Sequence, residues 1–494
     1  MTTDAPTRTG EDAPAPAREY VAPRWLRPPS VDAIVQLGLG VVALSLLAYS
    51  FGGIDSAPML GALLLALAGG CYLAVFTSPS WLFSLGLAMT IFSGNSKEIG
   101  FPIAPDRILI ASGLAAMVFG LPGYVKRRSL VLRPLHAVLA ITAAIGTISA
   151  FSAGTLFEAN GFFSLLDRLG LVPFLVFTLA PLIFSTKRDR NSLLVVLVGT
   201  GLYLGLVAVL EGTGNGAWAW PSYINDPTYG SHFGRARGPF AEPGGNGMTM
   251  YGCAVASAIA AFTWETRRSR IFAGIVMLLC LSGTIFTLTR SIWLATVVAT
   301  VFSLAVTSRT RRALVPILAA GLVALVAALT FVPGFADQVS ERQSSERPLW
   351  DRFNTNRAAL SMVLEHPLTG IGWHSFEERA PEYLEVSDAY PLTGVGIPVH
   401  NVPLGHAAEM GVIGASAWLL GLALVIGAAI LRPGYEELDP WRLGMVALFI
   451  HYTVVASFAP LGYAFPNLLL WTWAGITALS HTSRPYVPEE ADAT

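Results

Sequence analysis

The sequence predicts an all-α protein that crosses a membrane many times. Hydrophobic residues make up 53% of its 494 residues and charged residues only 13%, whereas a soluble domain has about 25% charged residues. Apolar stretches long enough to cross ~30 Å of hydrocarbon recur along the chain. With a net charge of −1, the chain has no excess of basic residues of the kind that nucleic-acid binders carry. We therefore expect the protein to lie in a lipid bilayer and to bind no nucleic acid.

Two polar tails flank the apolar part of the chain. We expect residues 1–30 and 482–494 to be disordered cytoplasmic tails. Between them the sequence predicts about 12–14 transmembrane helices, one group in 31–333 and a second in 403–481. The predicted spans are approximately 33–53, 58–76, 80–95, 107–122, 132–151, 161–184, 191–210, 247–264, 270–288, 291–307, 313–333, 403–431, 440–457 and 463–480.

Lys and Arg residues indicate which loops face the cytoplasm. With the N-terminus inside, the inner segments hold about twice as many of these residues as the outer segments, as the positive-inside rule expects. Both termini are then cytoplasmic. The two long loops, 211–246 and 334–402, are then extracytoplasmic, and long loops in compact proteins are usually functional.

The second long loop contains a predicted amphipathic helix at about 346–365. Trp350, Phe353, Leu360 and Leu364 recur at helical spacing, and Pro367 ends the run. Such a helix lies on the membrane surface or folds over a cavity.

Several arginines stand at the outer ends of spans. Arg235 and Arg237 precede one span, Arg290 lies between two spans, and Arg352 and Arg357 fall in the long loop. A guanidinium matches phosphate oxygens with two parallel hydrogen bonds, so these residues suit a phosphate or diphosphate. The alternative is that they are interfacial anchors whose charged heads reach the water.

One histidine, His400, stands where the long loop meets the next span. An imidazole accepts a proton from a hydroxyl near neutral pH, although a histidine that is only hydrogen-bonded in the interface is the simpler alternative. Metal binding by His400 and His406 is disfavoured, because a spacing of six does not place both on one helical face. A P-loop ATPase is excluded, since no Lys follows a Gly.

Four segments resemble the O-antigen ligase/O-antigen polymerase family of bacterial membrane glycosyltransferases. They are RGPFAEPGGNG at 237–247, TRSIWLA at 289–295, EHPLTGIGWHSF at 365–376 and HNVPLGHAAEMGVIG at 400–414. The last fits the ligase-type His-Asn-x9-Gly-x-x-Gly pattern without a gap. The first departs from the family's Arg-x-Gly-x-Phe-x-x-Pro-Asn pattern by a Gly-Gly insertion before Asn246, and in the second Thr289 stands directly before Arg290.

The resemblance implies a polytopic enzyme of the bacterial cytoplasmic membrane. It would transfer a glycan from a polyprenyl-diphosphate carrier to an acceptor hydroxyl on a lipid or glycan, with inversion and without a metal or other cofactor. His400 would be the catalytic base. The diphosphate would be bound by Arg237, Arg290 and Arg352, with Arg235 and Arg357 as further candidates.

Other residues are expected to support this site. Asn401, Glu409 and His374 lie within the matching segments. Asp167 and Arg168 lie near the outer end of a span, where they pair with each other or join the site. The sequence favours a ligase and leaves three alternatives: a polysaccharide polymerase, a protein O-oligosaccharyltransferase and a small-anion transporter. A transporter would need charges at mid-membrane depth in several spans.

Overall fold

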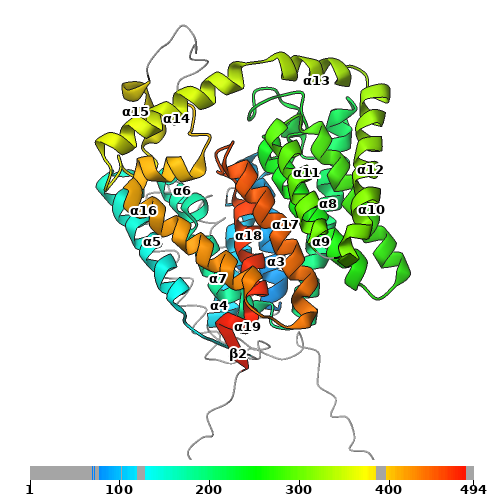
Figure 1. The fold of residues 1–494 in the computed structure, drawn as a ribbon, viewed down its shortest axis with the longest axis horizontal. Coiled ribbons are helices and arrows are strands. Elements are labelled where there is room, and N and C mark those ends of the chain that lie inside the picture. The colour runs from blue at the N-terminus through cyan, green and yellow to red at the C-terminus, as the bar shows by residue number, and fades with distance from the viewer. Residues whose placement is uncertain are drawn as a thin grey trace, which may run out of the picture.

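Figure 1 shows the fold of the chain in a computed structural model. The structure describes residues 69–70, 72, 77–101, 103–118, 128–306, 308–384 and 396–485. The predicted N-terminal tail, the first predicted span and most of the second and of the C-terminal tail lie outside these residues.

The all-α prediction is confirmed. The helices of the membrane-spanning bundle are α3 (Pro79–Met89), η2 (Thr90–Ile99), α4 (Pro105–Val118), α5 (Pro134–Ser152), η3 (Thr155–Phe157), α6 (Ala159–Ser164), η4 (Leu165–Leu169), α7 (Leu171–Ile183), α8 (Lys187–Gly212), α9 (Pro243–Thr263), α10 (Arg267–Phe286), α11 (Arg290–Ala305), α12 (Ser308–Phe331), α16 (Val402–Ile426), η8 (Gly427–Leu431), η9 (Glu436–Leu438), α17 (Asp439–Ala456), α18 (Ala464–Thr477) and α19 (Leu479–Thr482). Each span predicted from residue 80 onward overlaps one or more of these helices.

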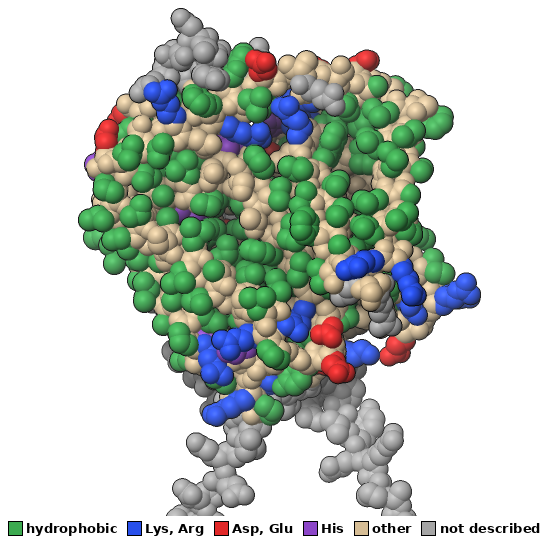
Figure 2. Space-filling view, viewed as in Figure 1, with side chains coloured by type: hydrophobic (Ala, Val, Ile, Leu, Met, Phe, Trp, Pro, Cys, Tyr) green, Lys and Arg blue, Asp and Glu red, His purple; other side chains and the backbone are tan. Residues whose placement is uncertain are grey.

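Among the described residues, six helices are long and apolar enough to cross a membrane. Figure 2 shows the same property on one face of the molecule, where a wide belt of hydrophobic side chains lies between two ends that carry most of the Lys and Arg. A belt of this kind matches the lipid core, because apolar side chains can face hydrocarbon while charged ones stay near water.

The helix α18 lies at the centre of the bundle (Figure 1). All of its residues from Phe465 to Thr477 are buried, as expected of a helix that is apolar all round. Its Trp473 donates a hydrogen bond through Nε1 to the Trp441 carbonyl of α17, at 2.8 Å. Gly475 lets α7 approach, since a Cβ there would lie 2.5 Å from the Phe177 carbonyl oxygen.

Three helices of the long loop form a cap over one end of the bundle (Figure 1). They are α13 (Phe335–Ser344), α14 (Arg347–Glu365) and α15 (Phe376–Tyr383). The prediction of a helix at about 346–365 is confirmed by α14. The short helices η5 (Gly216–Trp218), η6 (Ser222–Asn225) and η7 (Gly238–Phe240) belong to the first long loop.

At the opposite end of the bundle the chain forms a small antiparallel sheet. Strand β1 (Arg128–Leu130) pairs with β2 (Ser483–Pro485). On the side of the membrane to which the charge pattern assigns β1 and β2, Arg190 and Glu437 form an ion pair of 2.6 Å between α8 and η9. These contacts join segments that the charge pattern assigns to one side of the membrane, and the cap joins segments assigned to the other.

Candidate active site

Four arginines from separate elements come together beneath the cap. Arg235 lies in the first long loop, Arg290 begins α11, Arg342 lies in α13 and Arg352 in α14. Burial, followed by the charges of Arg342 and Arg290, lowers the pKa of Arg235 to about 10. Burial and then the charge of Arg290 also lower the pKa of Arg352. Figure 2 shows basic and histidine side chains gathered there, just beyond the apolar belt.

Local contacts hold two of these arginines in place. The Nε of Arg352 donates to the Phe458 carbonyl at 3.2 Å, and its guanidinium lies 5.9 Å from the centre of the Phe458 ring. Arg290 follows a tight turn after α10, in which Trp293 Nε1 donates to the Thr284 carbonyl at 3.1 Å. Its Nη2 lies 3.5 Å from the Ser345 carbonyl, between α13 and α14. The positions of these clustered arginines therefore depend on the packing of the cap against the bundle.

Arg237 has a different position from the one predicted. Its side chain is only 1% exposed. Its guanidinium donates to the backbone carbonyls of Tyr229, Ile224 and Asp226, at 2.5, 2.7 and 3.1 Å. These bonds occupy both terminal nitrogens of the buried guanidinium, so we assign Arg237 to holding the loop rather than binding the donor.

Backbone hydrogen bonds fix the first long loop directly after Arg235. Ala236 donates to the Phe286 carbonyl at the end of α10, at 2.9 Å. The Glu211 carboxylate accepts from the amides of Arg237 and Gly238, at 3.0 and 2.9 Å. A loop with so many fixed backbone groups presents Arg235 in one place despite its irregular path.

The inserted Gly-Gly pair has a steric reason. A Cβ at Gly245 would lie 2.8 Å from a ring carbon of Tyr463. The Tyr463 hydroxyl donates to Glu242 Oε2 at 2.6 Å, and Glu242 caps α9 by accepting from Gly245 N at 2.9 Å. The glycines therefore let the first turn of α9 pack directly against this tyrosine.

His400 faces the arginine cluster from the start of α16. Burial and then the charge of Arg352 lower its pKa, so the imidazole is neutral at neutral pH and able to accept a proton. Its Nδ1 is buried and makes no hydrogen bond within the described part of the chain. The next residue, Asn401, caps α16, since its Oδ1 accepts from Leu404 N at 3.1 Å.

Two further residues of the cluster, His232 and Arg342, were not predicted. The pKa of His232 is lowered to about 4 by its crowded surroundings, then by Arg235, Arg342 and His400. The two long loops thus meet at one place. His232 opens the segment that carries Arg235, and Arg342 lies in the predicted outer loop, but neither falls in a recognisable motif.

The other predicted residues fall into two groups. Arg357 lies on another side of α14 from Arg352, and Asp167, Arg168 and His374 interact with residues outside the arginine cluster. Arg357 follows Arg352 by five residues and so points about 140° away around α14. Asp167 pairs with Arg107 of α4 through both carboxylate oxygens, one of them at 2.9 Å, so the predicted Asp167–Arg168 pair is wrong. The charge of Arg168 instead interacts with the carboxylate of Glu409 in α16, and so does the charge of His374.

The segments 366–376 and 400–414 interlock. Helix α16 is broken at Gly411, which has φ 69° and ψ 176°. The carbonyls of Ala408 and Glu409 therefore accept from Ile371 and Gly372, at 2.9 and 3.0 Å, and Val412 N donates to the Pro367 carbonyl at 2.8 Å. The break at Gly411 therefore leaves backbone groups of α16 that bind the loop of residues 366–375, which we call the glycine-rich loop.

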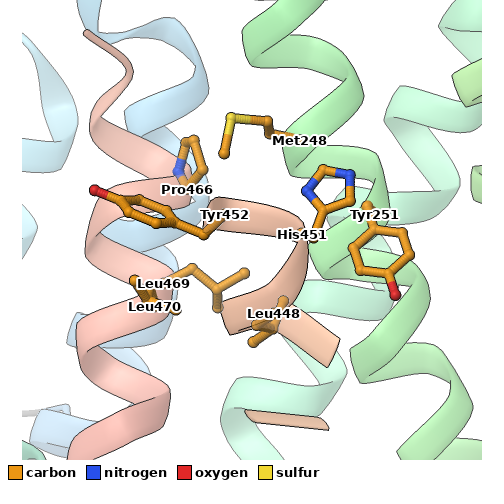
Figure 3. A pocket seen from close by; sticks show the side chains of 8 residues that line it. All are labelled: Met248, Tyr251, Leu448, His451, Tyr452, Pro466, Leu469 and Leu470. Carbon is orange, nitrogen blue, oxygen red and sulfur yellow. The ribbon is translucent and has the colours of Figure 1, made fainter. Parts of the chain in front are cut away.

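A second histidine, His451, lies deeper in the bundle and belongs to a small cavity (Figure 3). Its ring stacks on Tyr251 at 4.1 Å and 9°, and its Nε2 lies 3.5 Å from Thr296 Oγ1. Tyr452 and Met248 line the same cavity. His451 lies about 8 Å along the helix from the end of α17 at Ala456, and Phe458, whose carbonyl binds Arg352, follows this end.

Residues 275–419 match the model of the O-antigen ligase family. The chain carries an O-antigen ligase domain. The match runs from α10 into α16 and includes Arg290, Arg352, His400 and both interlocking segments, but not Arg235. No curated protein matches the chain. This match, together with the apolar helices, supports a membrane glycosyltransferase of the O-antigen ligase or polymerase type.

Proposed function

We propose that this O-antigen ligase domain transfers a glycan from a polyprenyl diphosphate to an acceptor hydroxyl at the extracytoplasmic face of the bacterial cytoplasmic membrane. One observation carries the proposal. Arginines from four elements lie near one another at the edge of an apolar belt, and one of them, Arg352, acts on the neutral His400. A lipid-linked diphosphate has the matching shape, with an anionic head next to an apolar tail.

The arginine cluster would bind the diphosphate. Burial first, and then the charges of neighbouring arginines, lower the pKa of Arg235 and of Arg352, so these cations repel one another in the free protein. An anion among them removes this repulsion and accepts charge-assisted hydrogen bonds. The same cations stabilise the negative charge that develops on the diphosphate as it leaves. We therefore propose a reaction without a metal.

His400 would be the catalytic base. It takes the proton of the acceptor hydroxyl while that oxygen attacks the anomeric carbon, and the bond from this carbon to the diphosphate oxygen breaks with inversion. The electron pair of the broken bond stays on the diphosphate. Burial and then the charge of Arg352 lower the pKa of His400 in the free protein. A bound diphosphate offsets the charge of Arg352 and so makes His400 more basic when the reaction begins.

A polymerase is the second candidate, because the family that the sequence resembles includes both O-antigen ligases and O-antigen polymerases. The acceptor then is another lipid-linked glycan rather than a surface lipid. Protein glycosylation uses the same donor site with a protein hydroxyl. An anion transporter is less favoured, since the four arginines of the cluster lie together at one end of the bundle rather than at mid-membrane depth in several spans.

The size of the lipid-linked glycan in cells lacking the protein separates the first two functions. A ligase deletion leaves long chains on the polyprenyl carrier, because polymerisation continues and transfer is lost. A polymerase deletion leaves single repeat units on the carrier. A normal carrier pool in the deletion strain contradicts both.

A further inference from the structure

Glu409 is a buried carboxylate on the half of α16 that follows His400. The side chain is 2% exposed. The break at Gly411 ends this half-helix two residues later, so residues 402–410 form a rigid piece of about two and a half turns. Contacts that fix the position of Glu409 therefore also fix the start of α16, which His400 precedes by two residues.

The residue makes contacts with three other segments. Its Oε1 accepts from the amide of Phe376 at the start of α15, at 3.4 Å. Its carbonyl accepts from Gly372 N at 3.0 Å and from Ser149 Oγ of α5 at 3.1 Å. One residue thus joins the half-helix of His400 to α5, to the glycine-rich loop and to α15.

The same loop leads back to the arginine cluster. Residues 366–375 connect α14, which carries Arg352, to α15. The loop lies directly against the half-helix, since a Cβ on Gly370 would be 2.5 Å from the carbonyl carbon of Glu409. This contact therefore contributes to the position of α14 relative to α16, together with the apolar cluster that Ala358 and Met362 of α14 form with Ala408 of α16.

The surroundings of the carboxylate are polar and incompletely paired. Glu409 Oε2, His406 Nε2 and Trp373 Nε1 are buried without hydrogen bonds among the described residues. Buried groups of this kind usually bind ordered water or serve a function. The charges that act on Glu409 come from Arg168 of η4 and from His374, and none of the arginines under the cap is among them.

We propose that Glu409 is a positioning residue that sets the distance between the base His400 and the diphosphate-binding Arg352. The proposal rests on the function proposed above. Glu409 does not touch the substrates; it holds the half-helix and the loop together through its bond to Phe376 N. A displacement of about 1 Å between reacting groups lowers the rate by about 100-fold.

The test compares Glu409→Ala and Glu409→Gln in the purified full-length protein. We expect Glu409→Ala to lower kcat about 100-fold while KM for a polyprenyl-diphosphate-linked glycan changes less than about threefold. Glu409→Gln keeps an acceptor oxygen for Phe376 N, so we expect it to restore most of kcat. Glu437→Gln is the matched control, because it removes the carboxylate of the Arg190 pair at the other end of the bundle; its kcat should equal that of the wild type.

Three results would overturn the proposal. They are wild-type kcat in Glu409→Ala, a loss in Glu409→Gln as large as in Glu409→Ala, and a change in KM alone. If Glu409→Ala does not fold, Gly370→Ala takes its place. It forces the loop off the half-helix, so it should also lower kcat selectively, and full activity would contradict the proposal.

Hydrogen exchange keeps this test separate from that of the proposed function. The amides of Ile371, Gly372 and Val412 should exchange faster in Glu409→Ala and at the wild-type rate in Glu437→Gln. Unchanged exchange in Glu409→Ala would show that Glu409 anchors nothing, whatever the enzyme does. A wild-type protein that transfers no glycan would contradict the proposed function while this exchange result still decides the anchoring.

Discussion

The substitution Gly411→Ala tests the interlock between the broken helix and the glycine-rich loop. At φ 69° and ψ 176° the backbone is in a region that only glycine enters readily, and an L residue there costs about 1–3 kcal/mol. The new Cβ would also lie 2.2 Å from the Leu368 carbonyl oxygen. Relief of that clash pushes the loop away and weakens three backbone hydrogen bonds, each worth about 0.5–1.5 kcal/mol.

We therefore expect Gly411→Ala to lower the free energy of unfolding by about 3–5 kcal/mol, with a Tm lower by roughly 5–10 °C. The assay is thermal unfolding in detergent at one fixed scan rate, because unfolding of such proteins is often irreversible. Gly427→Ala is the control, since its Cβ would meet no atom within 4 Å and its φ is −58°. Equal Tm values for the two variants would refute the reasoning.

Four further predictions concern the proposed site. His400→Ala should abolish transfer and keep donor binding. In the wild type, kcat/KM should fall only below pH 6.5, because the pKa of His400 is lowered and a base no longer accepts a proton once it is protonated. The kcat should fall at a higher pH than kcat/KM does. Arg290→Lys should lower kcat/KM roughly 100-fold in a transfer assay, because an ammonium lacks the two-pronged guanidinium. Arg237→Ala should lower Tm, because it strands three backbone carbonyls, whereas Arg235→Ala should weaken donor binding in a titration without lowering Tm. Turnover should persist in EDTA, and its complete loss there would point to a metal.

Helix α14 was predictable because its signals are local. Its apolar residues recur at helical spacing and Pro367 follows its end, so the predicted 346–365 differs from the observed Arg347–Glu365 by one residue. The spans from residue 80 onward were predictable for the same reason, since each is a continuous apolar stretch.

The side-chain partners could not be predicted in the same way. Arg237 looked like a phosphate ligand, but its three partners are backbone carbonyls whose positions depend on the folded loop. Asp167 binds Arg107, which is 60 residues away in the sequence, rather than the adjacent Arg168. The break at Gly411 depends on a backbone angle that glycine permits but does not require.

The small sheet of β1 and β2 affects the order in which the protein assembles. Arg128 Nε donates to Ser483 Oγ at 2.8 Å across a sequence separation of 355 residues, and Val131 N donates to the Thr482 carbonyl at 2.8 Å. Because the ribosome makes β2 long after β1, this closure forms only when the helices between them have left the translocon. Until then β1 lacks its partner strand, so a chain that stops before residue 483 lacks the contact that joins these two distant segments.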